Sequence, residues 1–179
     1  MLTTENTLLL VIDLQERLVP VMPRPEDLAQ KAATMIAGCR ILDVPIVVTQ
    51  QYTKGLGNTV EEIAEALEEF NPIEKVTFSC CNTEEFNDII TNAGRKNILV
   101  SGVEAHVCIQ QTVQDLLERG YNVYVIADCI SSRAETDLYY AEKRMEKAGA
   151  ILTTMESVLF ELLTRADHPK RKDISYLLK

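Results

Sequence analysis

Three residues that could act together chemically, Asp13, Lys75 and Cys108, each accompany an apolar run of strand length. Asp13 directly follows one such run, Lys75 lies within or beside another, and Cys108 follows a third after a short turn. Open parallel sheets bind ligands outside the carboxyl ends of their strands, so we expect these side chains to converge on one crevice. A carboxylate base, an ammonium group and a thiol are suitable parts of a cysteine nucleophile site.

Asp13 and Lys75 also have ordinary structural interpretations. Asp13 could cap the turn before Leu14, or act as a general base whose pKa is set by burial and a neighbouring cation. Lys75 could extend its ammonium group to solvent from an apolar strand. Alternatively, it could lie desolvated beside a carboxylate and a thiol, where it would favour the thiolate. The sequence leaves both alternatives open for each residue.

Cys108 follows a strand and a turn that contains Gly102, at the start of a predicted helix. The positive end of a helix dipole lowers a thiol pKa, and the N–H groups of the first turn can hold an oxyanion. A free cysteine is otherwise most often buried apolar filler. The position predicts that iodoacetamide alkylates Cys108 faster than the other cysteines at about pH 6.5. Burial and Asp13 oppose this lowering of the pKa.

Histidine is scarce, with only His106 and His168 in the chain, so a site built from several imidazoles is excluded. His106 lies two residues before Cys108, a spacing at which side chains seldom face each other. We therefore expect His106 to face solvent or an interface. Asp128 also ends an apolar run, but two serines follow it closely, so turn capping competes with a role in the site.

The composition restricts the class of protein. The chain has 179 residues, 46% of them hydrophobic, and a formal net charge of −9. This charge disfavours binding to nucleic acids and anionic membranes, and no apolar run is long enough to span a bilayer. Five cysteines without a C-x-x-C pair indicate reduced thiols. We therefore expect a cytoplasmic protein.

Apolar runs of strand length recur along the chain, and most are continuous, as expected for strands covered on both faces. They are residues 7–12, 45–49, 73–78, 97–101, 122–127 and 150–153. Segments with helical periodicity lie between them: one begins at Pro25, one carries Phe86, Ile89 and Ile90, one lies between Val107 and Gly120, and one covers 157–165.

Capping boxes predict two more helix starts, from Thr59 with Glu62 and from Ser132 with Glu135. The alternation of strands and helices predicts an α/β fold: a three-layer, Rossmann-like arrangement with about six parallel strands and helices on both faces. The locally basic tail, 165–179, is expected to pack on a neighbouring subunit or to fray.

The sequence resembles the isochorismatase-like hydrolase superfamily over nearly its full length, and above all its branch of isochorismatase domain-containing proteins. The resemblance implies a single domain of this type over residues 1–179. It is carried by Val-Ile-Asp-Leu-Gln at 11–15, Thr-Gln-Gln-Tyr at 49–52, Gly-Leu-Gly at 55–57, Lys-Val-Thr-Phe-Ser at 75–79, Gly-Val-Glu-Ala-His-Val-Cys at 102–108 and Ala-Asp-Cys-Ile-Ser-Ser-Arg at 127–133.

The resemblance implies that Asp13, Lys75 and Cys108 form the catalytic triad of the family. It also implies a cis peptide bond between Val103 and Glu104, which would direct backbone N–H groups near Glu104 and Cys108 at an oxyanion.

Two departures from relatives restrict the chemistry. Nicotinamidases of the superfamily bind a metal through Asp-x-His-x-x-x-His, whereas residues 50–56 contain neither aspartate nor histidine. Enzymes that hydrolyse isochorismate typically carry glycine where this chain has Cys108. The remaining expectation is hydrolysis of a small amide or related acyl compound through a thioester on Cys108. Gln15, Tyr52 and Phe78 are expected to wall the substrate pocket.

Two hypotheses from other classes remain beside the hydrolase. One is a non-catalytic binding or scaffold protein that keeps the fold, although an intact triad argues against it. The other is a thiol-redox protein, suggested by the adjacent Cys80 and Cys81 together with Cys108. We expect a small-molecule substrate, no cofactor and a homo-oligomer. The basic tail could pair with the acidic residues 61–74 of a neighbouring subunit.

We predict that the site binds no transition metal, because a carboxylate, an ammonium group and a thiol do not make a closed zinc shell. Elemental analysis of the untagged protein should find zinc and iron far below one equivalent per chain. Stoichiometric metal that is lost on replacing Asp13 or Cys108 would contradict the prediction.

Overall fold

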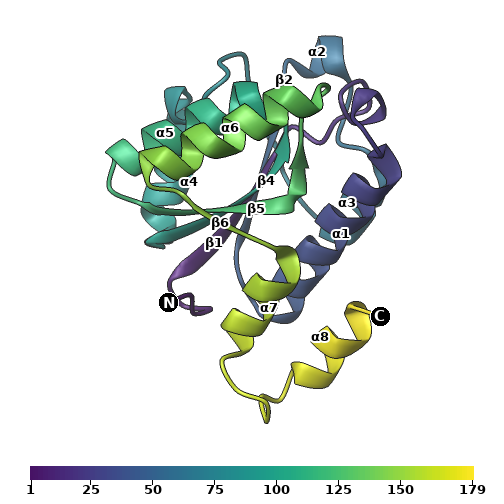
Figure 1. Cartoon of the computed structure of the whole chain (residues 1–179), viewed down its shortest axis with the longest axis vertical. Helices are drawn as coiled ribbons and strands as arrows, with labels where there is room; N and C mark the ends of the chain where they lie inside the picture. The colour runs from purple at the N-terminus through teal and green to yellow at the C-terminus, as the bar shows by residue number, and fades with distance from the viewer.

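The computed structural model describes all 179 residues and contains one parallel sheet of six strands, in the order β3-β2-β1-β4-β5-β6 (Figure 1). The strands are β1 (Thr7–Ile12), β2 (Ile46–Gln51), β3 (Ile73–Lys75), β4 (Asn97–Val103), β5 (Asn122–Ser131) and β6 (Ile151–Thr153). This confirms the predicted α/β fold. The strand order reverses between β1 and β4, the place where open sheets of this kind form their binding crevice.

Helices cover both faces of the sheet. They are α1 (Pro25–Ile41), α2 (Thr53–Leu56), α3 (Glu61–Leu67), α4 (Glu84–Ala93), α5 (Gln110–Glu118), α6 (Glu135–Ala148), α7 (Met155–Leu163) and α8 (Arg171–Leu177), with short turns η1 (Val19–Val21), η2 (Cys80–Asn82) and η3 (Ala105–Ile109). Buried residues of α1, α3, α7 and α8 share one apolar core, and those of α4, α5 and α6 share the other. The helices therefore form two outer layers around the sheet (Figure 1).

The central strand β1 shows why the apolar runs are continuous. All six of its residues are buried. Leu9 and Val11 belong to the core under α1, whereas Leu8, Leu10 and Ile12 belong to the core under α4 and α5. Successive side chains of a strand point to opposite faces, so a strand covered on both faces does not alternate between apolar and polar residues.

The predicted run at 73–78 is twice as long as the strand that forms. β3 ends at Lys75, and the chain then leaves the sheet with Val76 and Phe78 exposed to solvent. Conversely, β5 continues to Ser131, beyond its predicted end. The apolar character of residues 76–78 therefore reflects an exposed loop and not a buried strand.

The two helices predicted from capping boxes form, but the capping contacts themselves do not. The hydroxyl of Thr59 donates to the side chain of Gln50 (2.9 Å), and α3 begins after Val60. The hydroxyl of Ser132 lies 2.9 Å from Nδ1 of His106, and α6 begins after Ala134. In both places a partner outside the predicted helix binds the hydroxyl that the local pattern assigned to a helix N-terminus.

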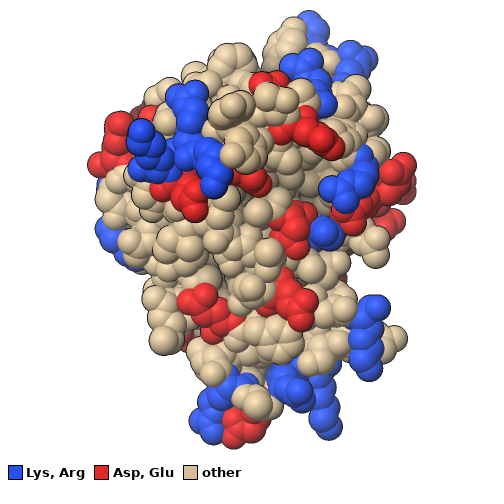
Figure 2. All heavy atoms as spheres, viewed as in Figure 1, with Lys and Arg blue, Asp and Glu red and all other residues tan.

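No helix is both long and apolar enough to cross a membrane. Acidic and basic side chains are interspersed on the face of the molecule that Figure 2 shows, without a continuous basic stripe.

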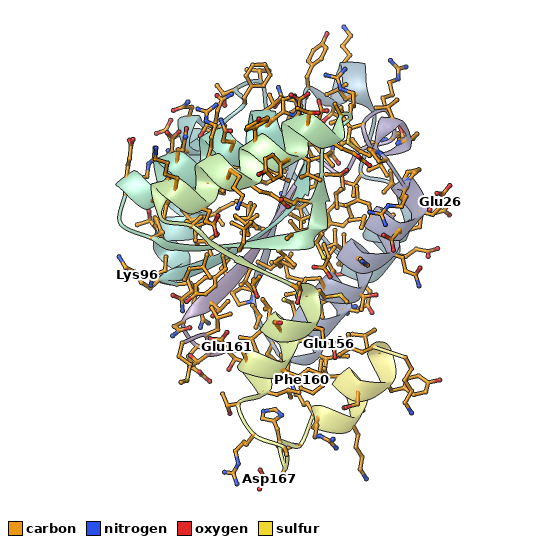
Figure 3. The ribbon with its side chains drawn as sticks, in the orientation of Figure 1. Glu26, Lys96, Glu156, Phe160, Glu161 and Asp167 are labelled. Atoms are coloured by element: carbon orange, nitrogen blue, oxygen red, sulfur yellow. The ribbon has the colours of Figure 1, made fainter.

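The basic tail packs on its own chain, so the expectation that it frays was wrong. Its helix α8 packs against α1, and Ile174 is fully buried there. Lys170, just before α8, pairs with Asp43. Phe160 of α7 lies between α7 and the following segment (Figure 3), beside a small cavity that Arg171 also lines. The pairing of this tail with a neighbouring subunit stays a prediction.

Gly102 lies inside β4 and not in a turn, with a φ of +133°. A Cβ atom at this position would lie 2.0 Å from the carbonyl oxygen of Ile12. The close approach brings the end of β4 against the end of β1, where Asp13 begins the loop.

We predict that Gly102→Ala lowers the free energy of unfolding by about 3 kcal/mol or more, because it adds both backbone strain and a clash with main-chain atoms. Gly94→Ala is the matched control, since Gly94 also has a positive φ (+62°) but has no atom within 4 Å of the position that a Cβ would occupy. The control should lose only about 1 kcal/mol. Urea unfolding measures both, and equal losses would contradict the role of the close approach.

Candidate active site

Asp13 is placed by the end of the central strand. It directly follows β1 and has a φ of +54°, a left-handed conformation that aspartate tolerates better than most residues. Its N–H donates to the carbonyl of Thr49 (3.2 Å), and the residue is fully buried. The carboxylate therefore lies inside the protein at the carboxyl end of the sheet and is not a solvent-exposed turn cap.

Lys75 forms a buried ion pair with Asp13. Its Nζ lies 2.6 Å from Oδ2 of Asp13, and neither side chain has any solvent exposure. The ammonium group also donates to Oε1 of Gln51 (2.7 Å) and to the carbonyl of Phe78 (3.3 Å). The alternative of a lysine that reaches out to solvent is therefore wrong.

Thr49 and Gln51 complete the surroundings of this pair and were missed in the sequence. The Thr49 hydroxyl donates to Oδ1 of Asp13 (2.7 Å), so both carboxylate oxygens are engaged. In the parallel register Thr49 lies beside Ile12, and Gln51 lies beside Lys75. Two polar residues spaced by two at the end of a buried strand point to the same face, and this signal could have identified them.

Cys108 lies in η3, a single π-helical turn between β4 and α5, and is 6% exposed. Its carbonyl accepts a hydrogen bond from the hydroxyl of Thr112 (2.7 Å), which in turn accepts one from the N–H of Cys80 (3.0 Å). These bonds fix the position of η3 relative to the chain that follows β3. Cys108 is the least buried of the five cysteines.

The predicted low pKa of Cys108 was wrong. Burial raises the pKa of the Cys108 thiol well above its usual value, and the Asp13 carboxylate raises it further. The Lys75 ammonium group opposes this increase without overcoming it. The resting site therefore contains a neutral thiol beside an ion pair.

The pKa of Lys75 is also raised, so its ammonium group stays protonated. Burial alone would lower its pKa, but the Asp13 carboxylate holds the pKa of Lys75 above its usual value. The thiol of Cys80 is fully buried near the pair, and burial raises its pKa to about 12.

Hydrogen bonds of Glu104 hold the turn that carries Cys108. The peptide bond between Val103 and Glu104 is cis, as the resemblance implies. Oε2 of Glu104 accepts hydrogen bonds from the N–H (3.1 Å) and Nε (2.9 Å) of Arg133, at the start of the segment before α6. The carbonyl of Glu104 accepts hydrogen bonds from Val107 (3.1 Å) and Ile109 (3.2 Å).

His106 and Asp128 have structural roles. The side chain of His106 is 26% exposed and lies near Asp137 (3.9 Å) as well as Ser132, on the side of the turn that faces α6. Oδ1 of Asp128 accepts a hydrogen bond from the N–H of Met155 (2.9 Å), at the start of α7. Capping therefore explains Asp128.

The expected pocket residues separate into two groups. Gln15 is fully buried, and its Nε2 donates to the carbonyls of Gln51 (3.0 Å) and Gly57 (2.7 Å). It therefore braces the main chain between the ends of β2 and α2. Tyr52 and Phe78 are 51% and 53% exposed, and their backbones lie against Lys75.

No group of three or more His, Cys, Asp or Glu side chains is arranged to hold a metal ion.

The isochorismatase domain model matches residues 7–157. The chain belongs to the isochorismatase family. It is 37% identical over 177 residues to isochorismatase domain-containing protein 2 of Danio rerio, covering 99% of this chain and 89% of that protein.

Two solved structures extend the family comparison. The MAR1 ribonuclease of Caenorhabditis elegans has a TM-score of 0.93 at 42% identity, covering 99% of this chain and 91% of the other. The YcaC protein of Escherichia coli, described as an octameric hydrolase of unknown specificity, has a TM-score of 0.89 at 23% identity, covering 98% and 86%. The second likeness shows the shared isochorismatase-like fold.

We predict slow alkylation of Cys108 by iodoacetamide at neutral pH, with a rate that keeps rising above pH 9, because only the thiolate reacts and its pKa is raised. Asp13→Asn should lower this pKa and accelerate labelling by removing a negative charge. Lys75→Met should raise the pKa and slow labelling by removing the positive charge. Mass spectrometry of labelled peptides measures each rate, and a labelling midpoint below about pH 8 in the unaltered protein would contradict the raised pKa.

Proposed function

We propose that this member of the isochorismatase family is a metal-independent cysteine hydrolase of a small amide or a related acyl compound. The observation that carries the proposal is the fully buried pair of Lys75 and Asp13 next to the Cys108 thiol. A buried carboxylate with both oxygens engaged and a fixed cation is suited to accept and return one proton.

The first half-reaction transfers the acyl group to Cys108. Asp13 takes the thiol proton as the sulfur attacks the substrate carbonyl, so that a C–S bond forms and the C=O becomes an oxyanion. Backbone N–H groups near Glu104 and Cys108 hold the oxyanion. The tetrahedral intermediate then expels the amine, which receives the proton from Asp13, and a thioester remains on Cys108.

The second half-reaction returns the free enzyme. Asp13 removes a proton from a water molecule, which attacks the thioester carbonyl. Collapse of this intermediate breaks the C–S bond, releases the carboxylic acid and returns the proton from Asp13 to the thiolate. Lys75 keeps its charge throughout and stabilises the thiolate when it forms, although its main contact is with Asp13.

A raised thiol pKa is compatible with this mechanism. The thiolate need not accumulate before the substrate binds, because Asp13 can remove the proton during attack. A neutral resting thiol is also a poor target for oxidants and unrelated electrophiles. This favours the hydrolase over the thiol-redox hypothesis.

The relatives support a hydrolytic function and leave the bond type open. The C. elegans relative is named a ribonuclease, and the E. coli protein is described as an octameric hydrolase. We propose a small-molecule substrate here because the net charge is −9, which repels a polyanion. We also propose a homo-oligomer and, from the reduced cysteines, a cytoplasmic location.

We predict that a panel of small amides and esters will contain a substrate whose hydrolysis needs all three residues. Cys108→Ala should lower kcat/KM by about 10³-fold or more, and Asp13→Asn by a similar factor, because the nucleophile and the proton carrier act as a unit. Lys75→Met should cost about 10²-fold. Cys81→Ala is the matched control, since Cys81 is buried outside the triad, and it should keep near-normal kcat/KM.

Rapid quenching with a slow substrate should trap an acyl group on Cys108, visible as a mass increase of one peptide. Full activity of Cys108→Ala would exclude the covalent mechanism. RNA oligonucleotides belong in the same panel, and RNA cleavage that depends on Cys108 would contradict the choice of a small acyl substrate. The absence of any turnover, with a ligand bound tightly, would favour the binding-protein hypothesis.

A further inference from the structure

A cavity at the end of β5 includes no residue of the triad. It has a volume of about 470 Å³ and is lined by the start of α1, the end of β5 and the side of α6. This volume is within the range of pockets that bind small molecules. The triad lies at the ends of β1 and β3 and in η3, so the cavity is a separate feature.

The charged lining of this cavity has a distinct arrangement. Arg24 and Lys31, both from the α1 side, are its cations, and each lies 3.8 Å from the same carboxylate, that of Asp27. A nitrogen–oxygen distance of 3.8 Å is too long for a hydrogen bond, so both cations keep donors free for a further partner. A ligand carboxylate could be bound at this wall.

The opposite wall carries carboxylates without cations. Glu135 and Glu142 of α6 line it, and Asp128 lies at the end of β5. Glu142 is half-buried, and burial raises its pKa above the usual value, as expected for a carboxylate that lacks a strong cationic partner. A ligand cation would supply that partner.

Two further side chains point to an organic ligand. Every fully buried polar side-chain atom in the protein has a hydrogen-bond partner. Ser131 borders the cavity and is only 6% exposed, but its hydroxyl has no hydrogen-bond partner within the protein. The exposed ring of Tyr139 also lines the cavity and packs edge-on against Tyr140. Such a ring is a suitable face for a guanidinium or ammonium group.

We propose that this cavity binds a small molecule that carries both a carboxylate and a cationic group, of the class of basic α-amino acids. The carboxylate contacts Lys31 and Arg24, the cationic groups contact Glu142 and Glu135, and Ser131 donates or accepts a hydrogen bond at the floor. Carboxylates outnumber cations in the lining, so a ligand with two positive groups and one negative group fits better than a neutral zwitterion.

The same cavity is linked to the turn that carries Cys108. Ser132, which follows Ser131 in the lining, bonds to His106, and the next residue, Arg133, bonds to Glu104. A ligand that contacts the segment between β5 and α6 should therefore also alter the access of reagents to η3. This link to Cys108 rests on the structure of the turn and not on the identity of the hydrolysed substrate.

Isothermal titration of the full chain with free arginine tests the proposal. Arginine should bind with one site per chain, and Nα-acetylarginine, which lacks the α-ammonium group, and agmatine, which lacks the carboxylate, should each bind about threefold more weakly or worse. Lys31→Met and Glu142→Gln should each weaken arginine binding by a similar factor. Lys147→Met on α6 and Glu118→Gln at the end of α5 are controls with the same changes of charge outside the lining, and both should bind arginine normally.

Labelling of Cys108 by iodoacetamide in the presence of arginine provides an independent measurement. Adding arginine should change the labelling rate in the unaltered protein and in Cys81→Ala. At the same arginine concentration the change should be smaller in Lys31→Met and in Glu142→Gln. Equal binding of agmatine and arginine would overturn the carboxylate part of the proposal. Unchanged arginine binding in both Lys31→Met and Glu142→Gln, or no arginine binding at all, would overturn the site, and neither result would bear on the hydrolase mechanism.

Discussion

A buried ion pair between Lys75 and Asp13 is the constraint on which the active site depends. Removing two charges from water costs several kcal/mol for each ion, and their attraction offsets this only where the remaining donors and acceptors are satisfied. Thr49, Gln51 and the carbonyl of Phe78 provide those partners. The adjacent parallel strands β1, β2 and β3 end at the same edge of the sheet. The residues at these ends therefore supply both the two charged groups and their hydrogen-bond partners.

Cys108 lies at the same edge of the sheet, where contacts other than the ion pair hold its turn in place. Gly102 allows the main chain of β4 to approach that of β1, and the turn that follows is bonded to the segment before α6 through Glu104 and Arg133. Cys108 is thus positioned by the contacts of the turn that carries it. The charge state of its sulfur is then decided by burial and by Asp13, with Lys75 opposing them.

Strand-end reasoning from the sequence was sufficient for the fold and for bringing Asp13 and Lys75 together, because continuous apolar runs report burial on both faces. It failed where a partner in another element decides the outcome. Thr59 and Ser132 bind side chains of other elements, so their local patterns predicted the helices but not the capping contacts. The direction of the Cys108 pKa shift depends on how much solvent reaches the thiol, and residue spacing does not report this.

The two edge strands of the sheet have a consequence beyond the active site. β3 and β6 each contain only three residues, whereas β1 contains six and β5 contains ten. A short edge offers few unpaired main-chain groups to a passing chain, which limits strand addition and the growth of intermolecular β-structure. Short edges thereby protect this apolar, parallel sheet, which stays open and does not close into a barrel.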